Sequence, residues 1–111
     1  MDYRLVRMGT VVLVLGIASL AGSSARAQGD AAALFKSKCA GCHAADGTGN
    51  TAAGKAMKVR DLHSPEVQKQ TDAQLTDIIT NGKSPMPGYK GKVTDEQIKE
   101  LVGYVRELGK K

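Results

Sequence analysis

The sequence predicts a small all-α fold of about four short helices joined by long loops. Two segments place hydrophobic residues at helical spacing, and each is preceded by a Thr-x-x-Gln capping box. After the first 27 residues, no segment of useful length alternates polar and apolar residues as a β-strand would. The stretches between the helical segments are rich in glycine and proline, which favour turns.

The first 27 residues have the three parts of a secretory signal peptide. Arg4 and Arg7 precede an apolar stretch over residues 8–22, and Ala25-Arg26-Ala27 supplies the small residues of a cleavage site. The apolar stretch, roughly 15 residues, falls short of the ~20 that a helix needs to cross a membrane. We therefore predict a cleaved signal at 1–27, not a retained anchor, and a mature domain at 28–111 exported to the periplasm.

The mature domain has little material for a hydrophobic core. A domain of this size buries only about 60% of the surface that its unfolded chain exposes. Its aromatic residues are Phe35, Tyr89 and Tyr104, and the chain has no tryptophan. Small domains of this kind usually rely on disulfides, a metal or a cofactor. Its mild positive charge, without basic runs interleaved with aromatics, gives no indication of nucleic-acid binding.

Capping residues predict where the helices begin and end. The four predicted helices run from the N-cap Asp30 toward Cys39, from Ser64-Pro65 through Lys69, from Thr71 to Asn81-Gly82, and from Thr94 to Gly109. The glycine-rich stretch over residues 44–55 is predicted to be a loop. Long loops of this kind are expected if they surround a cofactor.

The segment Cys39-Ala40-Gly41-Cys42-His43 has the C-x-x-C-H pattern of covalent haem attachment. Two thiols three residues apart on a turn can add to the two vinyl groups on one edge of a porphyrin. The histidine that follows can then offer an imidazole nitrogen to the iron. The pattern predicts one haem c, held by Cys39 and Cys42 and ligated by His43.

Three other interpretations of the two cysteines are less well supported. A thioredoxin-like motif requires a βαβ setting, which the sequence does not predict. A zinc site would need four ligands, and adding the distant His63 to the motif does not give an accepted spacing. A plain disulfide would suit an exported protein but gives His43 no role.

The second axial position of the iron has three candidate ligands, Met57, His63 and Met86, or it has none. Met86 lies between Pro85 and Pro87, which stiffen the loop before the last helix and help to hold a weak thioether ligand. Histidine–methionine ligation is also the usual arrangement of haem electron carriers. We therefore predict Met86. Met57 is expected to fill space in the core, and His63 is expected to lie at the surface.

Taken in order, these motifs resemble class I cytochromes c, especially the small bacterial and photosynthetic members. The resemblance covers most of Asp30 to Leu108. Its parts are Phe35 four residues before the first cysteine, the C-x-x-C-H motif, Asn81-Gly82-Lys83-Ser84-Pro85-Met86-Pro87, and Leu101-Val102-Gly103-Tyr104-Val105. It implies a small cytochrome c fold whose loops wrap one covalently attached haem.

The resemblance also implies that the first and last helices cross near Phe35, Leu101 and Tyr104, which then pack beside the haem. One departure affects the proximal histidine. About twelve residues after it, many members of this family place a proline whose carbonyl accepts a hydrogen bond from the imidazole, whereas this chain has Lys55. Such contacts tune the iron, so the acceptor for His43 is left unassigned.

The predicted function is that of a soluble, monomeric single-electron carrier, not an enzyme, that docks transiently with redox complexes. Five lysines near the haem-binding segments either steer the protein to an acidic partner or simply keep it soluble. They are Lys38, Lys55, Lys58, Lys83 and Lys90. The alternatives are a haem enzyme or gas sensor with an open iron position, and a binding domain stapled by a Cys39–Cys42 disulfide.

Overall fold

The structure, a computed structural model, describes Gly16 and residues 21–111. The predicted signal peptide lies mostly outside the described residues, so its cleavage stays a prediction. Six α-helices lie within the described part of the chain, which contains no β-strand. They are α1 (Ala21–Lys38), α2 (Ala40–His43), α3 (Ala52–Met57), α4 (Pro65–Gln68), α5 (Asp72–Asn81) and α6 (Asp95–Leu108). Over the same residues, no helix combines the length and apolar character needed to span a membrane.

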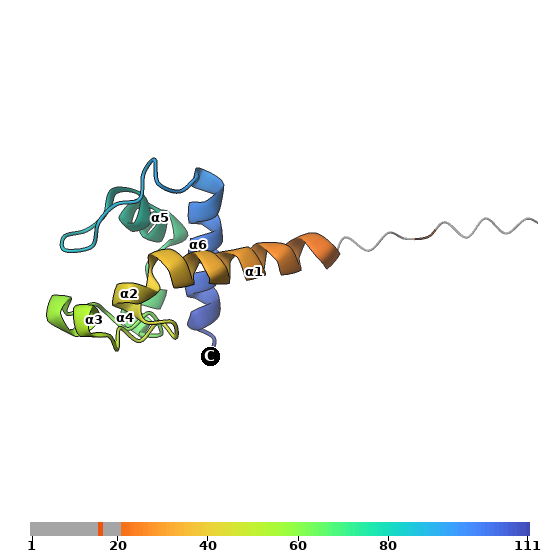
Figure 1. The fold of residues 1–111 in the computed structure, drawn as a ribbon. Helices are drawn as coiled ribbons and strands as arrows, with labels where there is room; N and C mark the ends of the chain where they lie inside the picture. The colour runs from red at the N-terminus through yellow and green to blue at the C-terminus, as the bar shows by residue number, and fades with distance from the viewer. Residues whose placement is uncertain (1–15, 17–20) are drawn as a thin grey trace, which may run out of the picture.

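The first and last helices cross and form the centre of the fold. Figure 1 shows α6 crossing α1 at a steep angle, with α5 on one side of the crossing and α2, α3 and α4 on the other. Phe35 of α1 is 2% exposed and packs against Tyr104 of α6, with 4.9 Å between the ring centroids. The predicted crossing of these helices is therefore confirmed.

The two capping boxes are formed as the sequence predicts. The Thr71 hydroxyl accepts from the Gln74 amide, and the Gln74 side chain accepts in return from the Thr71 amide; Thr94 and Gln97 repeat this pair of bonds at α6. Each box satisfies amides that a helix start leaves without partners. Gly82 ends α5 with a φ of +79°, a value that glycine adopts without steric cost.

Two local predictions were wrong. Helix α1 begins at Ala21 and passes through Asp30, which is therefore not an N-cap. The backbone before Asp30 is already helical, so the amides that an N-cap at Asp30 would satisfy have partners within α1. The predicted loop at 44–55 also contains the start of α3, where the hydroxyl of Thr51 accepts from the amide of Gly54 at 2.8 Å.

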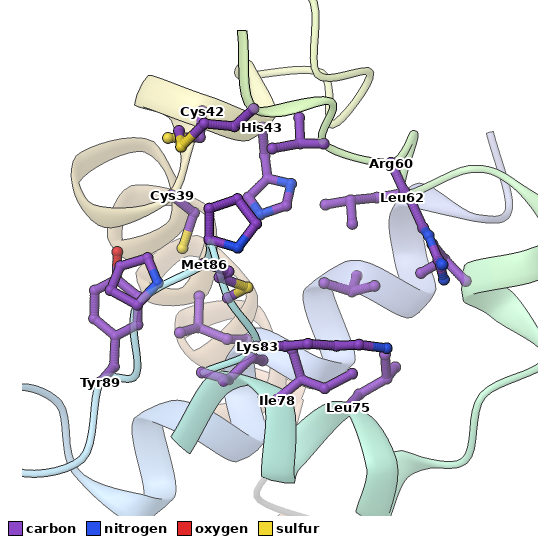
Figure 2. A pocket seen from close by; sticks show the side chains of 18 of the residues that line it. Cys39, Cys42, His43, Arg60, Leu62, Leu75, Ile78, Lys83, Met86 and Tyr89 are labelled. Carbon is purple, nitrogen blue, oxygen red and sulfur yellow. The ribbon is translucent and has the colours of Figure 1, made fainter. Parts of the chain in front are cut away.

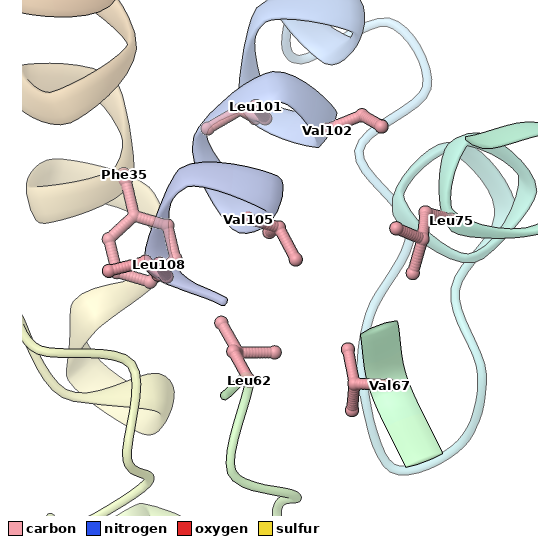
Figure 3. Packing of buried hydrophobic residues seen from close by; sticks show 8 residues of the cluster. All are labelled: Phe35, Leu62, Val67, Leu75, Leu101, Val102, Val105 and Leu108. Carbon is pink, nitrogen blue, oxygen red and sulfur yellow. The ribbon is translucent and has the colours of Figure 1, made fainter. Parts of the chain in front are cut away.

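The hydrophobic core lies where α4, α5 and the loop before α4 meet the α1–α6 crossing (Figure 3). The apolar stripe of α6 that the sequence predicts is buried along its whole length. The buried cluster consists of Phe35, Leu62, Val67, Leu75, Leu101, Val102, Val105 and Leu108.

Arg106 and Gln68 hold the α4–α5 turn against α6. The Arg106 guanidinium donates to the backbone oxygens of Gln68, at 2.8 Å, and Gln70, and to a carboxylate oxygen of Asp72 at 2.9 Å. The side-chain amide of Gln68 donates to the backbone carbonyls of Leu62 and Val105, at 2.7 and 3.0 Å. These bonds fix the position of α5, which forms one wall of the site described next.

Ile98→Ala should destabilise the fold without touching that site. Ile98 is 2% exposed and anchors the start of α6. Removing a buried isoleucine side chain typically costs about 2–5 kcal/mol, because transfer free energy is lost and a cavity is left. Denaturant unfolding followed by helical circular dichroism would measure this loss. The exposed neighbour Lys99→Ala should change the free energy of unfolding by less than about 0.5 kcal/mol.

Candidate haem-binding site

A largely apolar cavity of about 350 Å³ opens between α1–α2, α3, α5 and the loop that follows α5. Figure 2 shows the side chains of Cys39, Cys42 and His43 reaching it from one wall and that of Met86 entering from the loop after α5. The structure thus brings together residues that are far apart in the sequence. The cavity is within the range of roughly 300–1,000 Å³ that is typical of ligand pockets.

Helix α2 places both thiols and the histidine on that wall. Cys39 follows the last residue of α1, and its carbonyl accepts from the amides of Cys42 and His43 at 3.2 and 2.9 Å, which makes a tight turn. Both cysteines are half-buried, and both are free thiols in the described structure. Burial, together with the neighbouring Cys42, raises the pKa of the Cys39 thiol to about 11.

The raised thiol pKa argues against a redox-active C-x-x-C site. Reactive cysteines are thiolates at neutral pH because their surroundings lower the pKa. Cys39 has the opposite setting, because burial raises its pKa. Its half-buried side chain lies on the cavity wall, where it can anchor a cofactor.

His43 is held in the form that binds a metal. Burial lowers the pKa of its imidazole, so the neutral ring, which has a free nitrogen lone pair, predominates at neutral pH. Its backbone is fixed by the amide of Gly49, which donates to the His43 carbonyl at 2.7 Å. The hydroxyl of Thr51 donates to the carbonyl of Cys42 at 3.0 Å.

The Nδ1 atom of His43 is buried and has no hydrogen-bond partner among the described residues. Most buried polar atoms are paired, so Nδ1 is the nitrogen whose acceptor stays unassigned among the described residues. The other ring nitrogen, Nε2, is the atom that is left to bind a metal. A haem fits this donor set: two thiols and a neutral imidazole on the wall of an apolar cavity. Lys55, which stands where the family's proline is expected, makes no hydrogen bond to this nitrogen; its carbonyl accepts from the amide of Lys58.

Met86 lies on a loop whose base is closed by two glycines. The amide of Lys83 donates to the Met86 carbonyl at 3.0 Å, and the amide of Met86 donates to the Lys83 carbonyl at 2.8 Å. Next to these two hydrogen bonds, the backbone at Gly82 touches the backbone at Gly88. A Cβ on Gly82 would lie 2.6 Å from the amide nitrogen of Gly88. A Cβ on Gly88 would lie equally close to the carbonyl carbon of Asn81. The result is a compact loop with Met86 half-buried at the cavity.

The other two ligand candidates are placed differently. Met57, at the end of α3, also lines the cavity. His63 does not, because its Nδ1 bonds a carboxylate oxygen of Asp61 at 2.7 Å in a separate surface turn. Hydrogen bonds from the His63 backbone and side chain lower the pKa of the Asp61 carboxyl. Ligation by two histidines is therefore not supported.

Of the three residues predicted to pack beside the haem, Phe35 and Leu101 line the cavity, whereas Tyr104 packs behind Phe35. The sequence interpretation missed much of the lining. Leu75, Ile78 and Ile79 were recognised as the apolar stripe of α5 but not as a wall of the site. Further lining residues that were not predicted include Val59, Arg60, Gln70 and Tyr89.

Comparison with known proteins identifies the family. The profile of the family described as cytochrome C oxidase, cbb3-type, subunit III matches residues 26–105. Cytochrome c6 of Leptolyngbya boryana is 36% identical over 85 residues, which is 74% of this chain and 96% of the relative. Cytochrome c6 of Nostoc sp. is 33% identical over 108 residues, which is 97% of this chain and 91% of the relative. The solved structure of the c-type cytochrome KustC0563 superposes with a TM-score of 0.65 at 31% identity, covering 70% of this chain and 95% of that one.

The helical fold and the C-x-x-C-H cavity define a haem-binding electron-transfer protein. With these relatives, the chain belongs to the class I c-type cytochromes. It carries one covalently bound haem c and transfers electrons; it is not an enzyme. The sequence-based predictions of family, fold class and cofactor are thereby confirmed.

Gly54→Ala should disturb the proximal wall of the site. A Cβ at Gly54 would lie 2.3 Å from the carbonyl oxygens of Cys42 and Gly49, so α2 and α3 would have to move apart. We expect a loss of more than about 2 kcal/mol in the free energy of unfolding, as for other overpacked positions, and a lower yield of haem-loaded protein. Gly103→Ala in α6 is the control.

The Cβ of the control variant would meet nothing within 4 Å, and alanine is the better helix former by about 0.5–1 kcal/mol. This variant should therefore be as stable as the native protein or slightly more stable. Equal stability of the two variants would contradict the close packing of α2 on α3.

Proposed function

We propose that the chain is an exported one-electron carrier in which Cys39 and Cys42 form the thioether bonds to the haem. His43 and Met86 are the axial ligands of the iron. The observation that supports this most strongly is that these four side chains line one apolar cavity, although Met86 comes from a different part of the chain.

The bound haem supplies reversible exchange of one electron at its iron. The protein's contribution follows from its side chains. Cys39 and Cys42 fix one edge of the ring, and the neutral His43 imidazole donates without bringing a charge. The Met86 thioether is a soft ligand, and methionine–histidine ligation raises the reduction potential. The apolar walls keep water out, and this also favours the ferrous state, which carries less charge.

Filling both axial positions favours electron transfer over catalysis. A haem enzyme or gas sensor requires an open distal position with polar groups. His63 is bound to Asp61 in the surface turn and does not line the cavity. The loop around Met86 places the thioether between Pro85 and Pro87 on the cavity, with Lys83 and Ser84 beside them.

Met86→Ala should abolish the methionine–iron charge-transfer band of the ferric protein. The variant should bind carbon monoxide readily in the ferrous state, and its reduction potential should fall, because the soft axial ligand is lost. Optical spectra of the exported, haem-loaded protein and a potentiometric titration would measure both effects. The matched control is Met57→Ala, since Met57 lines the same cavity. Loss of the band in the Met57 variant alone would reassign the ligand and refute Met86.

The mouth of the cavity is positively charged, which supports docking to an acidic surface. Four cationic side chains line it, and we call them the rim cations: Lys38, Lys58, Arg60 and Lys83. All four are exposed, and none of the described lining residues is acidic. Arg60 makes a long surface contact of 3.5 Å with Glu66. Fields of this kind accelerate the encounter with partners of opposite charge.

The rim predicts a salt-dependent reaction with an anionic oxidant. Ferricyanide should oxidise the ferrous protein several-fold more slowly in the double variant Lys38→Glu, Lys83→Glu at low ionic strength. The difference should largely vanish near 0.5 M salt, since the Debye length is only about 10 Å at 0.1 M. Stopped-flow oxidation would measure these rates.

The control for this experiment is Lys110→Glu combined with Lys111→Glu, which makes the same charge change just beyond the carboxyl end of α6, away from the loop after α5 (Figure 1). If both double variants slow the reaction equally, only the net charge matters, and the rim is not the docking surface.

The cellular location and assembly state are part of the proposal. The signal-like segment 1–27 supports export to the periplasm. A small rim of cations around a haem site suits brief encounters with redox complexes, which bury little surface. We propose that the mature protein acts as a monomer.

A further inference from the structure

Tyr89 joins the loop that carries Met86 to the helix that precedes the haem cysteines. Its hydroxyl donates to the carbonyl of Lys38 at 3.0 Å, across 51 positions of the sequence. Lys38 is the last residue of α1, and its neighbour is Cys39. Helices leave their last carbonyls without an internal partner, so this bond satisfies an acceptor at the edge of the site. Figure 2 shows the Tyr89 ring beside the cavity, with its hydroxyl pointing toward the end of α1.

The backbone of Tyr89 is tied to a second helix. Its amide donates to the carbonyl of Ile79 at 2.9 Å, and the amide of Lys90 donates to the carbonyl of Thr80 at 3.0 Å. Tyr89 therefore marks the point where the Met86 loop returns to α5. Its main chain is fixed to α5, while its side chain reaches across to α1.

Among the residues that the structure describes, the other hydrogen bonds of the loop lie at its base. The Lys83–Met86 hydrogen bonds and the contact between Gly82 and Gly88 all lie within the loop or at its junction with α5. They set the shape of the loop but do not hold it against α1 and α2. Burial raises the pKa of the Tyr89 hydroxyl, so this donor is protonated at neutral pH.

We propose that Tyr89 is a positioning residue for Met86. Its hydroxyl bonds the loop to α1 and so keeps the thioether at the iron that His43 binds on the other wall. The proposal rests on the proposed function, in which Met86 is the distal ligand. In the closed form of the loop Met86 binds the iron, and in the open form it does not. Because a thioether is a weak ligand, a single hydrogen bond is strong enough to shift the equilibrium between these two forms. The Tyr89–Lys38 bond exists only in the closed form and therefore shifts that equilibrium toward ligation.

Tyr89→Phe tests the proposal, because it removes only the hydroxyl and keeps the ring on the cavity wall. Imidazole added to the ferric, haem-loaded protein binds only when Met86 has left the iron. Its apparent dissociation constant therefore reports the open fraction. Loss of one net hydrogen bond should raise that fraction about fivefold, so imidazole should bind about fivefold more tightly. The methionine–iron band should persist without imidazole.

Ser37→Ala is the matched control. It also removes a hydroxyl that donates to a backbone carbonyl of α1, that of Leu34 at 3.1 Å, but its side chain does not line the cavity and its printed bond stays within α1. Its imidazole affinity should equal that of the native protein. A second measurement compares the temperature at which the methionine–iron band is lost with that at which the helices unfold. In Tyr89→Phe, but not in Ser37→Ala, the temperature at which the band is lost should fall by more than the temperature at which the helices unfold.

The outcomes separate the two proposals. If Met86→Ala keeps the methionine–iron band, the assigned ligand is wrong and the proposed function fails first. If Met86→Ala loses the band but Tyr89→Phe binds imidazole with native affinity, ligation by Met86 stands and the role of Tyr89 is overturned. Equal tightening in Tyr89→Phe and Ser37→Ala would also overturn it, since any lost hydrogen bond would then have the same effect.

Discussion

The crossing of α1 and α6 at Phe35 is the contact on which the rest of the structure depends. It joins the two ends of the domain, and it places the cysteine motif at the end of one helix against the buried stripe of the other. The core built on this crossing is not separate from the haem site. Phe35, Leu62, Val67, Leu75, Leu101 and Val105 belong to the core cluster and also line the cavity. Forming the site and forming the core are therefore one process.

This shared surface explains why so small a chain can fold around few aromatic residues. A ring system placed in the cavity would contact the same leucines and valines that face one another in the cluster. The apolar area that it covers adds to the stability of the fold at roughly 25 cal/mol per Å². Interactions that position the cavity walls, such as the Arg106 bonds to the α4–α5 turn, consequently support the fold and the site together.

The sequence predicts those parts of the structure that depend on local chemistry. The capping boxes at Thr71 and Thr94 were recognisable because both hydrogen-bonding partners lie within four residues. The start of α1 was not, because Asp30 has the residue type of an N-cap but lies inside a helix that begins at Ala21. The cap of α3 was overlooked because glycines surround Thr51, although a threonine followed by two alanines is itself a signal. The cavity walls supplied by α5, and the bond from Tyr89 to Lys38, depend on contacts between distant segments that no local pattern contains.

The glycine pair at the base of the Met86 loop has a consequence for how this protein can change. Positions 82 and 88 tolerate no side chain, because the backbones of the loop touch there. Lys83 and Ser84, by contrast, lie at the exposed tip. A substitution at the tip alters the charge that a partner meets and leaves the geometry of the base intact. Partner preference and iron ligation are therefore separable by mutation within a single short loop, so a lineage can acquire a new redox partner without rebuilding its electron-carrying centre.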